Sequence, residues 1–283
     1  MSLVPLARIM VEPLVRGALL EDLGRAGDLT TDAVVPAGLA ARAALVAREP
    51  GVAAGLDLAK LAFELIDPNI AVQVECEDGA IVTPGGVIAR VSGPARGILT
   101  AERTALNFLG RLSGIASATA SVVAAVLGTK AKIVCTRKTT PGLRAVEKYA
   151  VRAGGGANHR FGLDDAILIK DNHIAIAGGI ARALRRARAA AGHLVKIEVE
   201  IDNLDQIKEA LGEGADVMLL DNMSLDWLAK AVATIDGHAI TEASGRITLE
   251  SAPAIAATGV DLISIGWLTH SAPVLDIGLD FEA

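Results

Sequence analysis

The chain of 283 residues is 52% hydrophobic and 21% charged, and its formal net charge is −6. This length allows one large domain or two modest domains with cores of their own. The acidic balance and the 2% of aromatic residues argue against a nucleic-acid-binding protein, which needs a basic face or aromatic side chains for base stacking.

The N-terminus and the cysteines indicate a cytoplasmic protein. Residues 1–24 are interrupted by prolines and charged residues, so they lack the continuous apolar segment of a signal peptide. Cys76 and Cys135 form no CxxC pair, which favours a reducing compartment. No uninterrupted apolar run reaches the roughly 18 residues that span a bilayer, so we expect no membrane insertion.

Residues 40–95 have the pattern of an α+β domain. Short segments with strand character, separated by Gly, Pro and Asp-Gly turns, predict an antiparallel sheet at 41–49, 71–78 and 85–93, with a helix over 56–65. Val72, Val74 and Cys76 alternate with polar residues, which places one face of that strand on a core.

A long apolar helix is predicted next, from Thr100 to about Leu127. Thr100 has the side chain of an N-cap, and Glu102 lies in the first turn, where the helix dipole favours an anion. We expect this helix to link two halves of the chain.

The segment Thr136–His173 concentrates positive charge in an acidic protein. It holds seven Lys and Arg side chains against four Asp and Glu side chains, interleaved with apolar residues. A local cationic pocket of this kind favours a small anionic ligand. Gly154–Gly156 permit close backbone approach or positive φ angles.

Beyond residue 130, strands and helices alternate. Six short apolar runs are expected as strands: 133–135, 166–169, 194–201, 217–220, 239–240 and 262–265. Helices are expected over 179–191, 204–211, 225–235 and 249–257, with Asn203, Ser224 and Thr248 as N-caps. The alternation predicts a parallel sheet, and six strands suggest a barrel that is incomplete against the usual eight. A doubly wound open sheet is the alternative, although no GxGxxG motif follows a strand.

Polar residues gather at the expected carboxyl ends of these strands, where α/β barrels carry their chemistry. Glu198 and Glu200 lie at alternate positions of one strand, and burying them unpaired would be costly. A structural pair between Lys170 and Glu200 is the simpler interpretation. Glu200 and Asp221 could instead hold Mg²⁺. Ser244-Gly245 and Gly266 follow the last two strands, where barrels often bind phosphate. Together these features suggest phosphoribosyl transfer, although spacing alone does not name it.

The chain resembles the quinolinate phosphoribosyltransferase family nearly end to end. The resemblance rests on EDLGRAGDLTTDAVVP at Glu21–Pro36, on TAERTALNFLGRLSGIA at Thr100–Ala116, and on TRKTTPGLRAVEKYAV followed by GGGANHRFGLDDAILIKDNH. The motifs EVEIDN, LLDN, EASGRIT and GVDLISIG complete the series in the family's order. Motifs of this length and number are very specific.

This resemblance implies a reaction, a cofactor and an assembly. Quinolinate and phosphoribosyl diphosphate would give nicotinate mononucleotide, diphosphate and CO₂ in NAD biosynthesis, with Mg²⁺ required. The fold would be an N-terminal α/β sandwich domain (residues 1–112) followed by an open, incomplete α/β barrel (113–270), with the tail 271–283 returning to the first domain. The assembly would be a homodimer, or an oligomer built from dimers, with active sites shared between subunits.

The resemblance also implies roles for individual residues. The quinolinate pocket maps onto Arg137, His159, Arg160 and Lys170, with Arg103 from the neighbouring subunit. Lys138, Lys170, Glu200 and Asp221 match catalytic residues around phosphoribosyl diphosphate and its metal, and Ser244, Gly245 and Gly266 match the 5′-phosphate loops. Arg246 and Trp267 depart from the family pattern, which has a small or polar residue at the first position and a small one at the second.

Three other functions are compatible with parts of this pattern. A paralogue could act on a different acceptor, although the complete HRFGLDDAILIKDNH run argues against it. A Schiff-base lyase could use Lys170, provided that its amine is desolvated. A non-catalytic protein would bind the ligands without releasing diphosphate.

Overall fold

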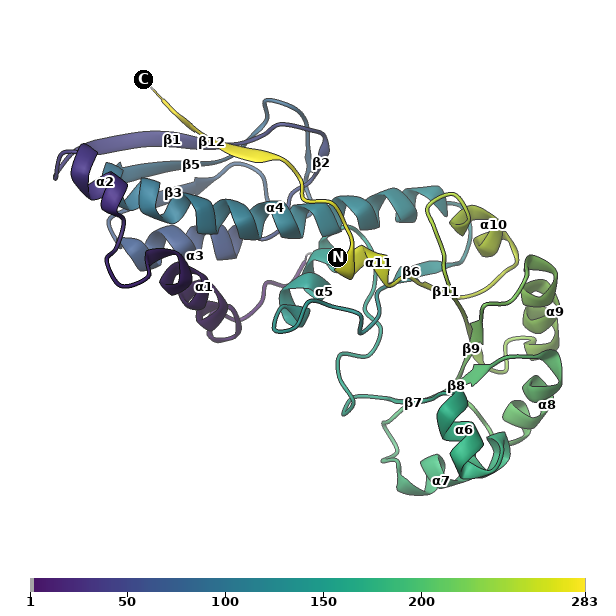
Figure 1. Ribbon diagram of the computed structural model, residues 1–283. Helices are drawn as coiled ribbons and strands as arrows, with labels where there is room; N and C mark the ends of the chain where they lie inside the picture. The colour runs from purple at the N-terminus through teal and green to yellow at the C-terminus, as the bar shows by residue number, and fades with distance from the viewer. Residues whose placement is uncertain (1–2, 283) are drawn as a thin grey trace. The chain divides into compact units, whose positions relative to one another are not determined.

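The computed structural model describes residues 3–282, which form two compact units (Figure 1). The first unit contains the chain up to Ala120, the segment Thr139–Gly155 and the chain from Leu268 onward. The second unit contains Ser121–Lys138 and Gly156–Trp267. Helix α4 (Ala95–Ala125) continues through residues 112 and 113 without a break, and the position of the domain boundary stays a prediction.

The first unit contains a four-stranded antiparallel sheet, as predicted. Its order is β12-β1-β5-β3, and the strands are β1 (Ala40–Ala47), β3 (Ala71–Val74), β5 (Val87–Pro94) and β12 (Ile277–Phe281). The C-terminal strand β12 pairs with β1 along five residues. A separate pair joins β2 (Gly51–Val52) to β4 (Ile81–Val82). The alternation that predicted β3 is present, since Val72 and Val74 are half-buried and Gln73 is exposed.

Five helices accompany this sheet. They are α1 (Arg8–Leu23), α2 (Leu29–Val34), α3 (Leu56–Ile66), α4 and α5 (Arg144–Ala153). Helix α3 matches its prediction, whereas the predicted start of α4 is wrong. The helix begins directly after Pro94 ends β5, so Thr100 lies inside it and is not an N-cap. The Thr100 hydroxyl instead donates to the carboxylate of Asp28, the N-cap of α2, at 3.0 Å.

Helix α4 is the one helix in the described chain that is long and apolar enough to cross a membrane by composition. Its most apolar 18-residue window has a mean hydropathy of 1.3, a possibility that the sequence analysis did not foresee. Half of that window is buried inside the protein, as in a core helix. Ala105, Leu109 and Ile115, for example, have no exposed surface.

Two of the three consecutive glycines perform the two tasks expected of them. Gly154 follows α5, and a Cβ atom there would lie 2.2 Å from the backbone oxygen of Ala116 on α4. Gly155 has a φ angle of 83°, a conformation that side chains other than glycine rarely adopt. The segment can therefore turn tightly against α4.

The second unit contains six parallel strands in the order β6-β11-β10-β9-β8-β7, at the positions that the sequence predicts. They are β6 (Lys132–Val134), β7 (Ile167–Ile169), β8 (Ile197–Ile201), β9 (Val217–Asp221), β10 (Ile240–Ser244) and β11 (Leu262–Ser264). Among the described residues β6 and β7 form the two ends of the sheet and do not pair with each other. The barrel is therefore open and incomplete, as expected.

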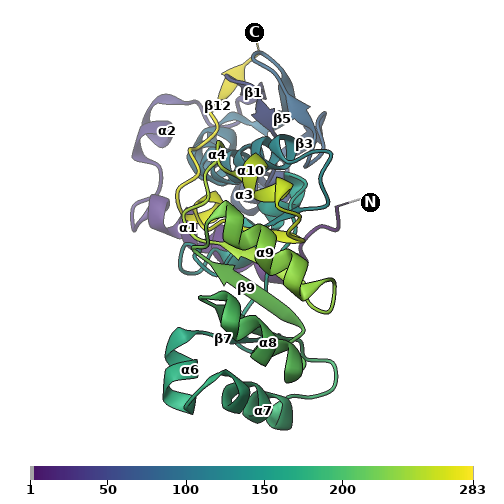
Figure 2. The same cartoon turned by 90° about the vertical axis from the view of Figure 1, so that its right-hand side faces the viewer.

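Helices line the outer side of this sheet. They are α6 (Asp171–Ala177), α7 (Ile180–Ala190), α8 (Leu204–Gly212), α9 (Leu225–Ile235) and α10 (Ala252–Ala257), and Figure 2 shows this layer from outside. Asn203 and Ser224 cap α8 and α9 as predicted. The predicted cap Thr248 is wrong, because a turn closed by hydrogen bonds between Thr248 and Ser251 precedes α10. After β11 the chain passes through the short helix α11 (Trp267–His270) to the first unit.

Candidate active site

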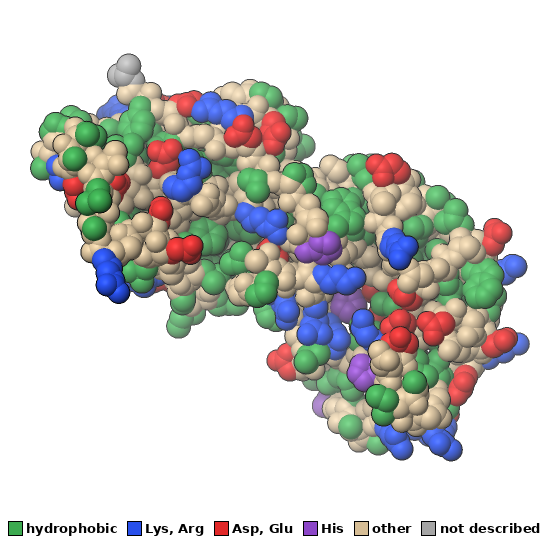
Figure 3. Space-filling model, in the orientation of Figure 1, with side chains coloured by type: hydrophobic (Ala, Val, Ile, Leu, Met, Phe, Trp, Pro, Cys, Tyr) green, Lys and Arg blue, Asp and Glu red, His purple; other side chains and the backbone are tan. Residues whose placement is uncertain are grey.

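Strand β8 presents two carboxylates to the inside of the barrel. Ile197, Val199 and Ile201 have no exposed surface and alternate with Glu198 and Glu200. Because side chains alternate along a strand, the two glutamates share the face opposite to these three residues. Figure 3 shows basic and histidine side chains beside acidic ones on one face of this unit. The alternation of apolar and acidic residues along β8 therefore produces a polar face on the inner side of the strand.

Two guanidinium groups lie close together next to Glu198. Burial lowers the pKa of Arg160, and the positive charge of Arg137 lowers it further, while the charge of Glu198 opposes both effects. The Nε atoms of Arg137 and Arg160 are buried without a hydrogen-bond partner. One Arg160 nitrogen donates to the backbone oxygen of Ala166 at 3.1 Å. Two neighbouring cations with unused donors form a site for an anion with more than one negative group.

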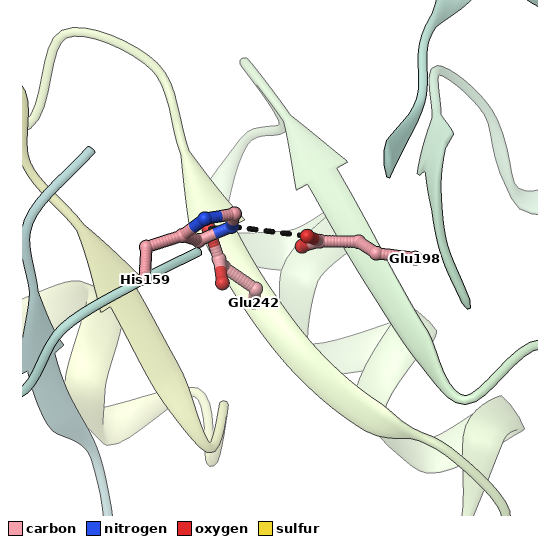
Figure 4. Close-up of side chains that lie close together, drawn as sticks. All are labelled: His159, Glu198 and Glu242. Carbon is pink, nitrogen blue, oxygen red and sulfur yellow. Dashed lines mark hydrogen bonds and ion pairs between the residues drawn. The ribbon is translucent and has the colours of Figure 1, made fainter. Parts of the chain in front are cut away.

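His159 lies beside two buried glutamates, Glu198 and Glu242 (Figure 4). Its Nε2 atom is 3.0 Å from Oε2 of Glu198 on β8 and 3.6 Å from Oε1 of Glu242 on β10. Burial, followed by the charge of Glu198, raises the pKa of Glu242 to about 7, and His159 opposes this shift. Glu242 was expected just after its strand, but β10 extends through it to Ser244.

Glu200 and Asp221 form a second acidic group at the rim. Burial and then the negative charge of Asp221 raise the pKa of Glu200, whereas the positive charge of Lys170 lowers it. Lys170 itself is exposed, and no ion pair within 4 Å joins it to Glu200 in residues 3–282. The structural pair considered from sequence is thus not formed, and Lys170 lacks the burial that a Schiff-base lysine needs. The two carboxylates offer the oxygen ligands that Mg²⁺ prefers.

The loops after β9 and β10 contact each other through unusual backbone conformations. Asn222 and Arg246 are two of the three non-glycine residues with positive φ in the described chain, at 52° and 47°. Between them, Gly245 has a φ of 108°, and a Cβ atom there would lie 2.2 Å from Oδ1 of Asn222. The Asn222 backbone N–H also donates to the Ser244 oxygen at 2.9 Å. The requirement for glycine at 245 is therefore steric as well as conformational.

The two residues that depart from the family pattern belong to this region. Arg246 is exposed, and the indole nitrogen of Trp267 donates to the backbone oxygen of Ile247 at 2.9 Å. The Trp267 side chain thereby connects the segment after Gly266 to the loop after Gly245 through a hydrogen bond. Ser244, Gly245 and Gly266 are half-buried at the carboxyl ends of neighbouring strands β10 and β11.

The cationic segment of the sequence divides between the two units. Arg137, Lys138, Arg160 and Lys170 belong to the second unit, with Lys138 exposed just after β6, whereas Arg144, Lys148 and Arg152 lie on α5 in the first unit. Arg103 also lies in the first unit, exposed on α4. The sequence-predicted residues that the structure brings together are thus those of the barrel.

Comparisons with known proteins cover both units. Residues 28–113 match the N-terminal domain of quinolinate phosphoribosyl transferase, and residues 115–280 match its C-terminal domain. The chain belongs to the quinolinate phosphoribosyltransferase family. It is similar to a nicotinate-nucleotide pyrophosphorylase [carboxylating] of Mycobacterium leprae, with 50% identity over 94% of this chain and 95% of the relative. It is also similar to a probable enzyme of the same name from Bacillus subtilis, with 47% identity over 96% and 93% of the two chains.

A solved member of the family has the same fold. The structure of the nicotinate-nucleotide pyrophosphorylase of Francisella tularensis superposes with a TM-score of 0.95 at 39% identity, covering 100% of this chain and 99% of that one. The fold class predicted from the sequence is therefore confirmed, and so is the family resemblance. The doubly wound alternative is wrong.

The predicted site did not include two buried glutamates. Glu198 and Glu242 were noticed as polar residues on strands, but no role was assigned to them. The signal that could have found them is the alternation on β8 and the glutamate within EASGRIT, both of which place a carboxylate in a barrel interior. That both contact His159 is visible only in the folded chain.

Proposed function

We propose that the barrel rim of this chain carries out phosphoribosyl transfer to quinolinate. The reaction joins the pyridine nitrogen of quinolinate to C1 of phosphoribosyl diphosphate and releases diphosphate and CO₂, giving nicotinate mononucleotide for NAD biosynthesis. Membership of the family supports this reaction. The observation that supports the assignment to these residues is the pair of half-buried arginines, Arg137 and Arg160, whose buried Nε atoms have no hydrogen-bond partner.

The residues of the pocket suit a dicarboxylate. Arg137 and Arg160 supply planar donors that match carboxylates in two places, and His159 and Lys170 add further positive groups. The pyridine nitrogen is itself the nucleophile, so its attack needs no protein base. As C1 becomes bonded to the nitrogen, the C1–oxygen bond breaks and its electron pair leaves with diphosphate. The protein's contribution is then orientation and preorganised charge.

Decarboxylation follows from the same geometry. Once the ring nitrogen is quaternary, it stabilises the electron pair left on C2 when the C2–carboxylate bond breaks, and a proton then replaces the lost CO₂. Arg137 and Arg160 would hold the two carboxylates in place during the first step.

Mg²⁺ is proposed as the cofactor, held by Glu200 and Asp221. The pKa of Glu200 is raised by burial and then by the negative charge of Asp221, and a divalent cation would relieve the repulsion between the two carboxylates. When bound, the ion would neutralise charge on the diphosphate leaving group. Lys138, exposed in the loop after β6, and Lys170, exposed directly after β7, would contact the same group, as the family resemblance implies.

The loops after β10 and β11 are proposed to bind the 5′-phosphate. Ser244 offers a hydroxyl, and Gly245 and Gly266 allow backbone N–H groups to approach the phosphate closely. The steric contact between Gly245 and Asn222 fixes the shape of the first of these loops.

The assembly and the compartment are also proposals. Arg103 would reach the quinolinate pocket of a second subunit, in a homodimer or an oligomer built from dimers. A cytoplasmic location agrees with the names of the bacterial relatives, which mention no organelle. Relatives from rice and tobacco are named chloroplastic and mitochondrial, respectively.

One assay tests the proposed function. The purified protein is incubated with quinolinate, phosphoribosyl diphosphate and Mg²⁺, and nicotinate mononucleotide, diphosphate and CO₂ are measured. We expect all three products in equal amounts. Nicotinate, which lacks the 2-carboxylate, serves as the comparison substrate. We expect it to react much less efficiently, because each lost charge-assisted hydrogen bond is worth about 1.5–3 kcal/mol. Comparable catalytic efficiency with nicotinate would refute the assignment.

A further inference from the structure

His159, Glu198 and Glu242 come from three separate segments of the second unit and meet inside the barrel. Their nearest nitrogen and oxygen atoms all lie within 4.8 Å of one another. The Glu198 and Glu242 residues are 7% and 1% exposed, and 12% of the His159 side chain is exposed. Figure 4 shows Nε2 of the imidazole ring facing Glu198, with that interaction marked, and the Glu242 side chain next to the ring.

Two buried carboxylates this close together repel each other, so their negative charge needs a hydrogen-bond donor or a positive group nearby. Each of them has one oxygen, Oε1, that is buried without a hydrogen-bond partner. Burying a charged group without a partner is costly, so the stable arrangement is the one in which the carboxylates lie beside a hydrogen-bond donor. That donor is Nε2 of His159, at hydrogen-bond distance from Glu198 and slightly farther from Glu242. Nε2 of the ring is therefore hydrogen-bonded to Glu198 and lies close to the charge of Glu242.

The surroundings favour an anionic ligand over a metal ion. The three side chains could ligate a cation by their spacing alone. However, the charge of Glu198 also acts on Arg160, and Arg137 lies close enough to Arg160 to repel it. A metal ion beside two guanidinium groups would be opposed by both. Their unused Nε donors instead favour a negatively charged acceptor, and the proposed substrate has two carboxylates.

We propose that Glu198 and Glu242 are positioning residues for the dicarboxylate substrate: acting through His159, they fix the orientation of its imidazole ring and hold a proton on Nε2. This inference rests on the proposed function, because it takes quinolinate as the ligand of His159. Removing the Glu198 carboxylate would break the hydrogen bond that orients the ring at Nε2, which weakens the contact of the ring with a substrate carboxylate.

The test is a double-mutant cycle between Glu198 and His159. The variants are Glu198→Gln, His159→Asn and the double variant, with Glu213→Gln on the surface of the same unit as control. We expect Glu198→Gln to raise KM for quinolinate about tenfold, as the loss of one charge-assisted contact does. KM for phosphoribosyl diphosphate should stay within about twofold of the wild-type value. In the His159→Asn background Glu198→Gln should add nothing further, because it acts through that ring.

Glu242→Gln is the second variant, in case Glu198→Gln does not fold. It should also raise KM for quinolinate selectively, and its effect should also vanish in the His159→Asn background. Equal increases of KM for both substrates, or effects of the glutamates that multiply with that of His159→Asn, would overturn the proposal. About one equivalent of a transition metal in the purified protein, lost in the Glu198→Gln variant, would overturn it in favour of a metal site. Wild-type turnover of quinolinate separates these outcomes from a failure of the proposed function, which would abolish that turnover.

Discussion

Arg111 on α4 donates a hydrogen bond of 2.8 Å to Oε1 of Glu147 on α5, and Glu147 has no exposed surface. The same carboxylate accepts from the backbone N–H and the hydroxyl of Thr140. The Arg111 guanidinium also donates to the backbone oxygens of Thr269 and Ala272. One buried ion pair therefore connects the linking helix, the loop before α5 and the C-terminal chain within the first unit.

Glu147→Ala should destabilise the protein strongly. Removing one partner leaves a partly buried guanidinium without its carboxylate and costs about 3–5 kcal/mol in comparable pairs. The midpoint of urea unfolding measures this loss. Asp280→Ala is the control, because Asp280 pairs with Arg48 on the surface of the same unit, where ion pairs contribute little. Equal, small effects of both variants would show that the Arg111–Glu147 pair is not a structural connection.

The sequence predicted the fold of the second unit because its signals are local. Short apolar runs alternate with amphipathic stretches, and Asn203 and Ser224 mark helix starts by their own side chains. Thr100 failed as a cap because strand β5, which includes Gly93 and Pro94, leads straight into a helix that begins at Ala95. Helix α5 was not predicted, since the segment that contains Glu147 and Lys148 was interpreted as part of a cationic pocket, whereas both residues are buried on α5.

The candidate site was predictable in its residues but not in its contacts. Motifs identified Arg137, Arg160 and Lys170, and their roles stay predictions. The register of the parallel strands places Glu242 of β10 beside Leu219 of β9. Strand β9 separates β10 from β8, and at this register the Glu242 side chain lies close to His159. No spacing along the chain contains that information, because residues 159, 198 and 242 are brought together only when the strands of the second unit pair.

The stability of the protein should depend on pH through Glu242. Its pKa of about 7 in the folded protein lies above the ordinary value of 4.5, so the folded state binds a proton that the unfolded state has released between these values. The stabilising contribution is complete below pH 4.5 and is lost as the pH rises towards 7.

Glu242→Gln should remove this dependence, because an amide does not ionise. Relative to wild type, the free energy of unfolding of the variant should increase by up to about 3 kcal/mol between pH 4.5 and 8. Urea unfolding of both proteins at several pH values measures the difference. A difference that stays constant over this range would mean that Glu242 is ionised throughout.

Glu200→Gln should lose activity without losing stability. The raised pKa of Glu200 means that its ionised form is disfavoured in the folded protein, so its contribution to stability decreases as the pH rises above the ordinary value of 4.5. At neutral pH without metal, the variant should melt at the same temperature as wild type or higher. Mg²⁺ titration with phosphoribosyl diphosphate should show a weakened metal dependence of both activity and melting temperature.

Asp202→Asn is the matched control for this experiment. Asp202 is exposed two residues further along the chain, and it also raises the pKa of Glu200. The control should keep its metal dependence, since no metal role is assigned to it. A collapsed melting temperature for Glu200→Gln would instead indicate that Glu200 compensates a buried cation.

Subunit mixing tests whether Arg103 completes the site of a second chain. Arg103 is exposed on α4 and Lys170 is exposed at the end of β7. If each site takes Arg103 from its partner, Arg103→Ala and Lys170→Ala should each be nearly inactive alone. A mixed dimer would contain one site with both defects and one site with neither, as two-fold symmetry dictates. Random mixing makes about half of the dimers mixed, so activity should return to about a quarter of wild type. Exchange of subunits measured with labelled chains provides the control, and exchange without recovery would show that Arg103 does not act across an interface.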